Sequence, residues 1–518
     1  MFVACIQLRA NSIFEYKAAY ENVLHMTEEA GKAGAQLAVL PECAYPAYFL
    51  GLDMDKAKEA IVHGSGLTEK LKSLAAQYKM YIAAGIVTEQ ENRLYNSVIM
   101  IDDSGKIIKS AAKSNLWHFD SKWFTASEQY EVFETRYGVM GMIICADGRM
   151  PEICRILSLA GARVIIDPVN LAAAAEEPGL LNNMQCQFIL PARAAENGVW
   201  IIAADKVGLE AGCVNYSGRS MVIDPRGKIA ACASPDRQEI IYHEMDLCLE
   251  PELKPPERRP ELYGVLTEEN STLPVSADLE KPRVMQECEV FCSTIMYRAP
   301  TPEEYLSKAK LYIYCCEKLG SKLLLLPQCL FEMDRIIGEL TDIIPDEGLV
   351  AATGTESGIK CAAILSKEHI PVKWYKTHRN KDNELLSDMR FHCADTRYGK
   401  IGIIFDEEAY VPEIARAYML LGCNILLWSD CSTRETDTKM LQSRAAENKI
   451  FVVRNASAEN DCGSVSDTEG MILTSTFRNA EQAAHAMIIY PLSLSKTVVP
   501  GTNVVTGRIN RSYRSLTE

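Results

Sequence analysis

The chain has 518 residues, which is too many for one ordinary hydrophobic core and predicts two large domains or three smaller ones. Hydrophobic residues make up 48% and charged residues 24%, a composition that excludes a disordered chain and indicates a globular one. The net charge of -15 argues against a nucleic-acid or anionic-membrane partner, because binding to phosphate requires clustered Lys and Arg.

The first ten residues predict a β-strand rather than a signal peptide, because no basic region precedes their apolar stretch and the charged Arg9 and Glu15 come soon. No apolar run approaches the roughly 18 residues that a membrane-spanning helix needs. Without an export signal, the 18 cysteines are expected to be reduced thiols of a cytoplasmic protein. Neither Cys-x-x-Cys nor His-Glu-x-x-His occurs, and we expect no metal and no other cofactor.

Short apolar runs rich in Val and Ile alternate with helical patterns through the first half of the chain. The runs that predict strands are 36–40, 81–87, 95–101, 139–144, 163–167, 199–204 and 220–223. The patterns that predict helices are 15–33, 66–77, 151–160 and 184–197. This alternation predicts an α/β layered fold.

Three reactive residues lie where chemistry is expected, because α/β enzymes gather their catalytic groups at strand ends. Glu42 follows the strand 36–40, Lys113 ends the segment 106–112, and Cys145 follows the strand 139–144. A turn comes after Cys145, and a proline then opens a helix. Each residue alone has an ordinary interpretation, since a cysteine after an apolar strand is usually a small buried hydrophobic residue.

Motifs of the first half recur in the same order in the second half, which indicates a duplication. They are Leu-Pro-Glu/Gln-Cys at 40–43 and 326–329, Thr-Arg-Tyr-Gly at 135–138 and 396–399, Pro-Glu-Ile-x-Arg at 151–155 and 412–416, and Arg-Ala-Ala-Glu-Asn at 193–197 and 444–448. Leu-Thr-Glu also ends both 258–268 and 508–518. We therefore expect a first domain over 1–268, a polar linker over 269–282 and a second domain over 283–518.

The residues around the three candidates resemble one family. Leu-Pro-Glu, then a Lys, then Cys-x-Asp-x-Arg-x-Pro-Glu and Arg-Ala-x-Glu-Asn are similar to the nitrilase superfamily of carbon–nitrogen hydrolases, in that family's order. The similarity continues through 216–227 and 258–263, so it covers 1–268. It implies a four-layer αββα sandwich of the nitrilase kind, present twice in this chain. It also implies that Glu42 is the general base, Lys113 the oxyanion stabiliser and Cys145 the nucleophile.

The chemistry of these side chains agrees with those roles. A thiolate is the nucleophile, and a carboxylate can take the thiol proton. The Lys113 ammonium and the backbone N–H of Ala146 can stabilise the oxyanion that attack on an amide creates. After ammonia or an amine leaves, Glu42 activates water to hydrolyse the thioester. We therefore predict a hydrolase whose partner is a small linear amide or N-carbamoyl compound.

Several further residues are candidates for the site. The family commonly places a second Glu shortly before an aromatic pair, and here Asp120 or Ser121 precedes Trp123-Phe124, so Asp120 either serves as this acid or is an ordinary surface residue. Arg193 and Glu196 are predicted to form a supporting ion pair on a helix. The candidates for substrate binding are Tyr45, Tyr48, Asn170 and Arg149, the last of which either binds a substrate carboxylate or forms a structural ion pair.

The turn after the nucleophile favours an amide or ureido substrate. Nitrilases typically carry Cys-Trp-Glu, whereas this chain has Cys145-Ala-Asp, which is similar to amidases and N-carbamoyl amine hydrolases. Nitrile hydrolysis and acyl transfer by the same triad stay open as alternatives. A serine hydrolase is disfavoured because Gly-x-Ser-x-Gly is absent. The non-enzyme alternative is a regulatory or binding protein with a remnant site.

The second half lacks the catalytic set and is predicted to be inactive. Gln328 replaces the glutamate, and Lys376 survives. Alignment with one gap places Phe405 at the nucleophile position, with one residue inserted before Pro412. Family members generally associate as dimers, and a fused copy supplies a partner at high effective concentration. We therefore expect an internal pseudo-dimer, and further homo-oligomerisation stays open.

Overall fold

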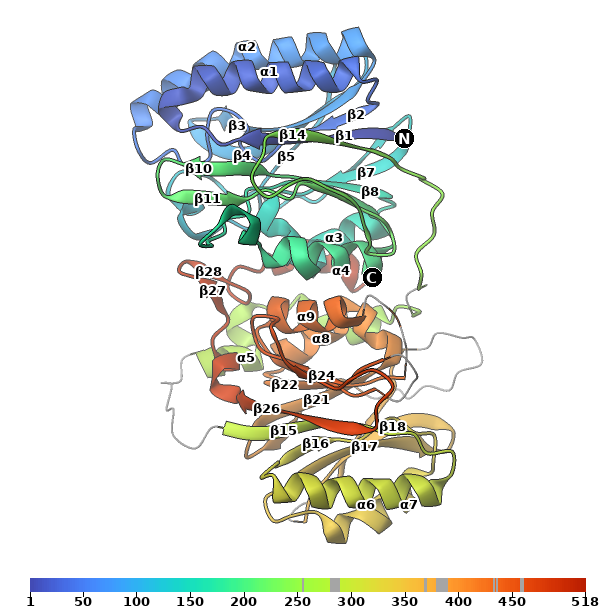
Figure 1. Cartoon of the computed structure of the whole chain (residues 1–518). Coiled ribbons are helices and arrows are strands. Elements are labelled where there is room, and N and C mark those ends of the chain that lie inside the picture. The colour runs from blue at the N-terminus through green and yellow to red at the C-terminus, as the bar shows by residue number, and fades with distance from the viewer. Residues whose placement is uncertain are drawn as a thin grey trace. The chain divides into compact units, whose positions relative to one another are not determined.

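The computed structural model describes residues 1–253, 256–279, 289–367, 370–378, 390–431, 434, 437–456 and 461–518 (Figure 1). The chain forms two compact units. Unit 1 comprises Met1–Leu253 together with Val498–Asn503, and unit 2 comprises Lys254–Thr497 together with Val504–Glu518. Within the described ranges, no helix has the length and apolar character that crossing a membrane requires.

The division between the units differs from the predicted boundary at 268. Residues 256–268 belong to unit 2, where the Tyr263 hydroxyl hydrogen-bonds His378 Nε2 at 2.7 Å. The predicted linker over 269–282 contains helix α5 (Pro274–Leu279), and its Leu273 and Val275 are buried. The end of that linker and the predicted start of the second domain at 283 lie outside the described residues. Sequence similarity assigned residues 256–268 to the first domain, but it did not reveal that they pack in unit 2.

The first sheet of unit 1 has the strand order β11-β10-β1-β2-β3-β4-β5, and β14 also pairs with β1. Strands β1, β2 and β3 are parallel, and β4 and β5 continue antiparallel. Their bounds are β1 Phe2–Arg9, β2 Leu37–Val39, β3 Tyr81–Gln90, β4 Arg93–Ile101, β5 Ile107–Ala112, β10 Lys206–Glu210, β11 Val214–Ser217 and β14 Glu239–Glu244. Helices α1 (Tyr16–Lys32) and α2 (Met54–Tyr78) cover its outer face (Figure 1).

The second sheet of unit 1 has the order β13-β12-β9-β8-β7-β6, with β7, β8 and β9 parallel. Its strands are β6 Val132–Thr135, β7 Gly138–Met142, β8 Val164–Pro168, β9 Trp200–Ala204, β12 Met221–Ile223 and β13 Ile229–Cys232. Helices α3 (Pro151–Leu159) and α4 (Leu190–Asn197) cover its outer face, the latter preceded by a π-turn over Gln185–Ile189. The predicted α/β layering is thus confirmed for this unit.

The strand β1 shows why the layers form. Its alternate residues Ala4 and Ile6 are buried against the helices, whereas Val3 and Cys5 join the core between the two sheets. A strand that is buried on both faces reads as a continuous apolar run, as residues 2–6 do here. Every predicted strand and helix of the first half is present, although α2 begins at Met54 rather than at 66.

Unit 2 contains two six-stranded sheets, of order β19-β18-β17-β16-β15-β26 and β20-β21-β22-β23-β24-β25. The first consists of β15 Glu289–Met296, β16 Leu323–Leu325, β17 Leu349–Glu356, β18 Ile359–Leu365, β19 Val372–Tyr375 and β26 Gln482–Ile489. The second consists of β20 Ala394–Thr396, β21 Gly399–Phe405, β22 Ile425–Ser429, β23 Phe451–Arg454, β24 Ser464–Ser466 and β25 Ile472–Ser475. A short hairpin follows, β27 (Thr497–Val499) and β28 (Thr502–Asn503).

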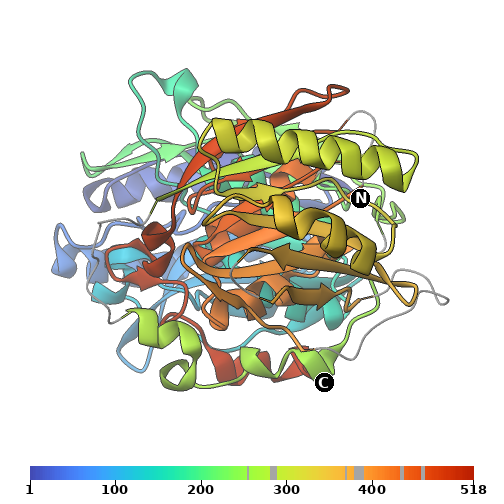
Figure 2. The same ribbon diagram turned by 90° about the horizontal axis from the view of Figure 1, so that it is seen from below.

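Helices α6 (Pro302–Lys318) and α7 (Met333–Leu340) pack on the first sheet of unit 2, and Figure 2 shows them in yellow and gold across its strands. Helices α8 (Pro412–Leu420) and α9 (Asp437–Asn448) accompany the second sheet. Within each sheet the parallel strands lie in the middle, as they do in unit 1. Unit 2 is therefore also an α/β layered body.

Candidate active site

The three predicted catalytic residues lie where strands of unit 1 end, Glu42 beyond β2, Lys113 after β5 and Cys145 beyond β7. The Lys113 Nζ is 2.9 Å from Glu42 Oε1 and 2.7 Å from Asp120 Oδ2. Glu42, Lys113 and Asp120 have no solvent-exposed surface. The structure therefore brings Asp120 into the cluster and excludes its interpretation as a surface residue.

Glu42 is held by one oxygen and leaves the other available. Its Oε1 accepts hydrogen bonds from Lys113 Nζ and, at 2.6 Å, from Asn96 Nδ2. Its Oε2 has no hydrogen-bond partner among the described residues. Sequence reasoning did not single out Asn96, although an amide inside the predicted strand 95–101 is a signal that could have found it. A carboxylate oxygen without a partner can accept a proton from a substrate or a thiol.

Cys145 begins a 3-10 turn, Cys145–Arg149, and has the left-handed backbone angle φ 52. This conformation is uncommon for a non-glycine residue and persists only where the surroundings hold it. The Asp167 carboxylate accepts from the Cys145 N–H at 2.7 Å, and Gln185 Nε2 donates to the Cys145 carbonyl at 2.9 Å. The thiol sulfur lies 3.9 Å from the Asn170 carbonyl oxygen. These contacts fix the direction of the thiol.

Ala146 follows Cys145 in the same turn and is 3% exposed. The first N–H groups of a helical turn have no intrahelical acceptor, so this one suits the predicted oxyanion role. Asp147 links the turn to the loop that follows Lys113. It accepts from the backbone N–H of Asn115 at 2.7 Å and of Ile144 at 3.1 Å. The two loops that carry Lys113 and Cys145 are thus tied together by one carboxylate.

Electrostatics keep the resting thiol neutral and the lysine charged. Burial raises the pKa of the Cys145 thiol well above its ordinary value, the Glu42 carboxylate raises it further, and Lys113 opposes both. Burial by itself lowers the pKa of Lys113, but the Asp120 and Glu42 carboxylates raise it well above its ordinary value. Burial also raises the pKa of Asp147 to about 6. Attack by sulfur therefore requires proton transfer to a neighbouring base.

A pocket of about 590 Å³ lies beside this cluster. Tyr48 connects the two, since it lines the pocket and its ring centre is 5.6 Å from Lys113 Nζ. The other lining residues are Trp117, His118, Phe119, Asn170, Ala172, Ala173, Ala174, Ala175, Cys213, Val214 and Asn215. None of these lining residues is Asp, Glu, Lys or Arg. The pocket offers to a ligand an aromatic wall that contains no Asp, Glu, Lys or Arg.

The remaining sequence candidates divide into two groups. Tyr48 and Asn170 line the pocket, and Asn170 Nδ2 also donates to the Glu42 carbonyl at 3.0 Å. Tyr45 lies elsewhere, because its hydroxyl donates to the Ala60 carbonyl of α2 at 2.6 Å and only 2% of its surface is exposed. The Arg149 guanidinium stacks 5.1 Å from the Trp117 ring centre and is not among the lining residues.

Arg193 and Glu196 form the predicted ion pair, which is fully buried. Arg193 Nε also donates to the Gly148 carbonyl at 3.1 Å, so the pair supports the turn that carries Cys145. Asp167 and Gln185, which also hold this turn, were not anticipated from the sequence. Polar residues at the end of a buried strand or inside a buried helical segment are the signal that could have identified them.

In unit 2, Asp406 has the place relative to the repeated motifs that Cys145 has in unit 1. Asp406 begins the turn Asp406–Tyr410 after β21 and has φ 44, as Cys145 does after β7. Its spacing from the shared Thr-Arg-Tyr-Gly and Pro-Glu motifs is the same as that of Cys145. The placement of Phe405 there was wrong, and no residue is inserted before Pro412. The assumed gap shifted the alignment, and the positive φ fixes the register.

The side chains around Asp406 form a network of hydrogen bonds and ion pairs. Gln328 Nε2 donates to Asp406 Oδ1 at 3.0 Å, Lys360 forms an ion pair with the other oxygen, and Lys376 lies 3.7 Å from it. Lys360 stands where unit 1 has Asn96, because its carbonyl accepts from Lys376 N as that of Asn96 does from Lys113 N. Gln328 and Asp406 thus stand in place of a glutamate and a cysteine, and the thiol that contacts Asp406 is that of Cys431, whose Sγ lies 3.4 Å from Asp406 Oδ1.

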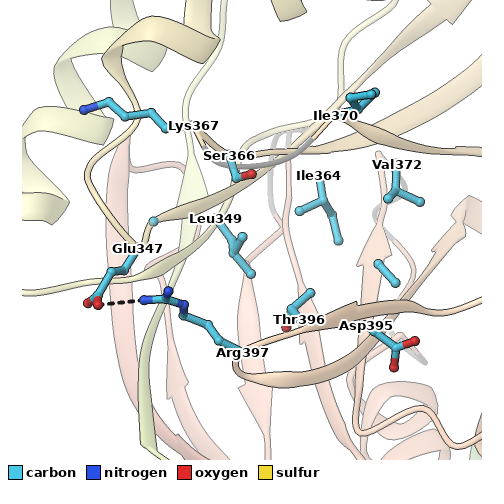
Figure 3. A pocket seen from close by; sticks show the side chains of 12 residues that line it. Glu347, Leu349, Ile364, Ser366, Lys367, Ile370, Val372, Asp395, Thr396 and Arg397 are labelled. Carbon is cyan, nitrogen blue, oxygen red and sulfur yellow. Dashed lines mark ion pairs between the residues drawn. The ribbon is translucent and has the colours of Figure 1, made fainter.

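Unit 2 has a pocket of about 540 Å³, which lies at the opposite end of β21 from Asp406. Figure 3 shows Leu349, Ile364 and Val372 on its walls and an ion pair between Glu347 and Arg397 at its side. Among the described residues, the one group of carboxylates close enough to share a metal ion is Asp430, Asp437 and Asp461. All three bind the guanidinium of Arg454, which already supplies the positive charge.

Comparison with known proteins concerns the residues of unit 1. The sequence model of the family described as carbon-nitrogen hydrolase matches residues 2–253. A nitrilase of Pyrococcus abyssi is 31% identical over 253 residues, which cover 48% of this chain and 90% of that protein. An omega-amidase of Bos taurus is 27% identical over 47% of this chain and 88% of its own length. An N-carbamoylputrescine amidase of Solanum lycopersicum is 24% identical over 48% of this chain and 90% of its own length.

Among solved structures, the crystal structure of an amidase from Nesterenkonia sp. matches with a TM-score of 0.41 and 22% sequence identity. The match covers 47% of this chain and 89% of that one.

Proposed function

The chain belongs to the carbon–nitrogen hydrolase family, and on that premise we propose that it hydrolyses small linear amides or N-carbamoyl compounds through a thioester on Cys145. One observation carries the proposal. Lys113 is held between two buried carboxylates, those of Glu42 and Asp120, beside a buried thiol and a pocket lined by no Asp, Glu, Lys or Arg.

In the first half-reaction, Glu42 takes the thiol proton while the sulfur of Cys145 attacks the carbonyl carbon. The Lys113 ammonium and the Ala146 N–H stabilise the oxyanion of the tetrahedral intermediate. The C–N bond then breaks, and the leaving nitrogen takes the proton from Glu42 and departs as ammonia or amine. The acyl group remains on sulfur as a thioester.

In the second half-reaction, water replaces the leaving group. Glu42 accepts a proton from this water, whose oxygen attacks the thioester carbonyl at the same oxyanion site. The C–S bond breaks, the acid leaves, and the proton returns to the sulfur. Asp120 contributes by compensating the ammonium: once Glu42 has accepted a proton, the Asp120 carboxylate still favours the charged form of Lys113 through both tetrahedral intermediates.

The lining of the pocket supports an uncharged substrate. A substrate carboxylate would need a fixed cation, and Arg149, the residue proposed for that task, instead stacks on Trp117. The aromatic residues Trp117 and Phe119 can cover an apolar or ureido tail. Nitrile hydrolysis is the second candidate, because the protein that is 31% identical is described as a nitrilase.

An ammonia-release screen of primary amides, N-carbamoyl compounds and nitriles tests the proposal, each compound with and without a carboxylate. We expect turnover of uncharged amides or carbamoyl compounds, with nitriles poor and all activity absent from Cys145→Ala. Preferential turnover of nitriles would select the second candidate. Absence of turnover in every class, with Cys145 modified by no substrate, would favour the regulatory or binding alternative.

Unit 2 is proposed to be an inactive second copy of the same fold. The order β19-β18-β17-β16-β15-β26 repeats β5-β4-β3-β2-β1-β14, and the second sheet repeats β6-β7-β8-β9-β12-β13 in the same way. Gln328, Asp406 and Lys376 occupy the positions of the catalytic set. We also propose that the copies associate as an internal pseudo-dimer and that the thiol enzyme works in the reducing cytosol.

A further inference from the structure

A hairpin from near the end of the chain belongs to the catalytic unit. Val498–Asn503, which includes most of β27 and all of β28, is part of unit 1. Its Thr502 Oγ1 accepts a hydrogen bond from His118 N at 2.9 Å and lies 3.4 Å from the Leu116 carbonyl, to which it can donate. One hydroxyl therefore satisfies both a donor and an acceptor of the loop 116–118.

The loop that receives this hydroxyl is a wall of the substrate pocket. Trp117, His118 and Phe119 all line the pocket. His118 has φ 48, a left-handed conformation that a non-glycine residue keeps only when its surroundings hold it. The bond to Thr502 is made by the N–H of this same residue. The hairpin thus contacts the wall at its strained position.

The same loop leads to the catalytic cluster. The Trp117 N–H donates to Asp120 Oδ2 at 3.0 Å, the oxygen that pairs with Lys113. The wall is therefore anchored at Trp117 by the catalytic cluster and at His118 by the hairpin. The first anchor belongs to the family's site, whereas the second comes from residues beyond the matched range 2–253.

We propose that Thr502 is a positioning residue for substrate binding, which holds the wall Trp117–Phe119 in the shape that receives the substrate. This inference rests on the proposed function. It implies that the catalytic unit is complete only when the chain continues to residue 503, and that the hairpin affects the affinity for substrate rather than the chemical step.

The test uses the full chain with Thr502→Val, which keeps the side-chain shape but removes the hydroxyl, and Thr502→Ser as the matched control. Loss of one neutral hydrogen bond should raise KM for the best substrate about fivefold at nearly unchanged kcat. Thr502→Ser should match the wild type. Hydrogen exchange at the His118 amide should accelerate in Thr502→Val alone, at an unchanged melting temperature.

An unchanged KM in a folded Thr502→Val protein would overturn the proposal, and so would a fall in kcat at constant KM, since the hairpin would then act on the catalytic groups. If the wild type turns over no compound of the screen, the proposed function fails. The hairpin is then judged by the rate at which iodoacetamide, a small amide, alkylates Cys145. A rate altered in Thr502→Val but not in Thr502→Ser supports the inference, and equal rates in all three proteins overturn it.

Discussion

Glu42→Gln separates two effects of Glu42 on the Cys145 thiol. The carboxylate accepts the thiol proton in the proposed mechanism, and its charge raises the pKa of the thiol. The substitution keeps an oxygen that can accept from Lys113 and Asn96, which now lie 2.9 Å and 2.6 Å from Oε1. It removes one of the two negative charges beside Lys113, whose contact with Asp120 at 2.7 Å remains. The fold should therefore persist, while the ability to accept a proton is lost.

Turnover should fall by between about a hundredfold and ten-thousandfold, the range that a positioned general base contributes. The pKa of Cys145 should fall as well. The Glu42 carboxylate raises this pKa and Lys113 lowers it, so removing the carboxylate should stabilise the thiolate. The pH dependence of Cys145 alkylation should shift to lower pH in a protein that hardly turns over.

The assay combines kcat/KM for an amide with the rate of iodoacetamide modification of Cys145 as a function of pH, followed by peptide mass spectrometry. Asp120→Asn is the matched control, because it removes an equal charge beside the same ammonium and leaves the base in place. It should lose less activity than Glu42→Gln. If Glu42→Gln kept more than a tenth of the wild-type rate, Glu42 would be structural and Asp120 would become the candidate base.

Four further perturbations test the remaining reasoning. Cys145→Ala should abolish turnover without unfolding, and intact-protein mass spectrometry of quenched wild type should show an acyl adduct at Cys145; an adduct on another cysteine would contradict the mechanism. Asp147→Asn should flatten a pH dependence of stability: burial raises the folded pKa of Asp147 from 3.8 to about 6, so its stabilising contribution is full below the unfolded pKa and is lost as pH rises through the folded one. Denaturant unfolding should show the variant gaining on the order of 3 kcal/mol over wild type between pH 4 and pH 7, and parallel curves would contradict this. Gln328→Glu with Asp406→Cys, made in Cys145→Ala, should stay inactive because Lys360 replaces Asn96 beside the base; measurable turnover would show that unit 2 is more intact than its charges indicate. Residues 1–268 expressed alone should be less stable or self-associate, because this fragment lacks Val498–Asn503 of its own unit; size-exclusion chromatography and thermal melting decide, and a stable, fully active monomer would contradict this.

The strands of unit 1 and the residues at their ends were predictable because both are local properties. Short apolar runs specify β2, β7 and β8, and a reactive residue directly after such a run is expected at a sheet edge. Glu42 and Cys145 could be identified in this way without knowledge of the pairing of strands. The motifs that surround them supplied the chemistry by resemblance.

The register of less regular segments was not predictable, since it depends on backbone conformation. Sequence spacing left Asp120 and Ser121 equally placed, and the short turn His118–Lys122 directs Asp120 to Lys113. In unit 2, the positive φ of Asp406 corrects an alignment that had favoured Phe405. Asn96 became significant only when β4 brought it beside Glu42.

By itself, the sequence of this chain predicted which residues are candidates for catalysis and which segments of unit 1 form strands and helices, because periodicity and motif order are encoded over short spans. Only the tertiary structure decided which distant segments complete each body. Residues 256–268 pack in unit 2, and Val498–Asn503 packs in unit 1 against the pocket wall at His118. Contacts of that kind join residues far apart in sequence, and their free energy depends on the shape and hydrogen-bonding groups of the surface they meet, which no local pattern records.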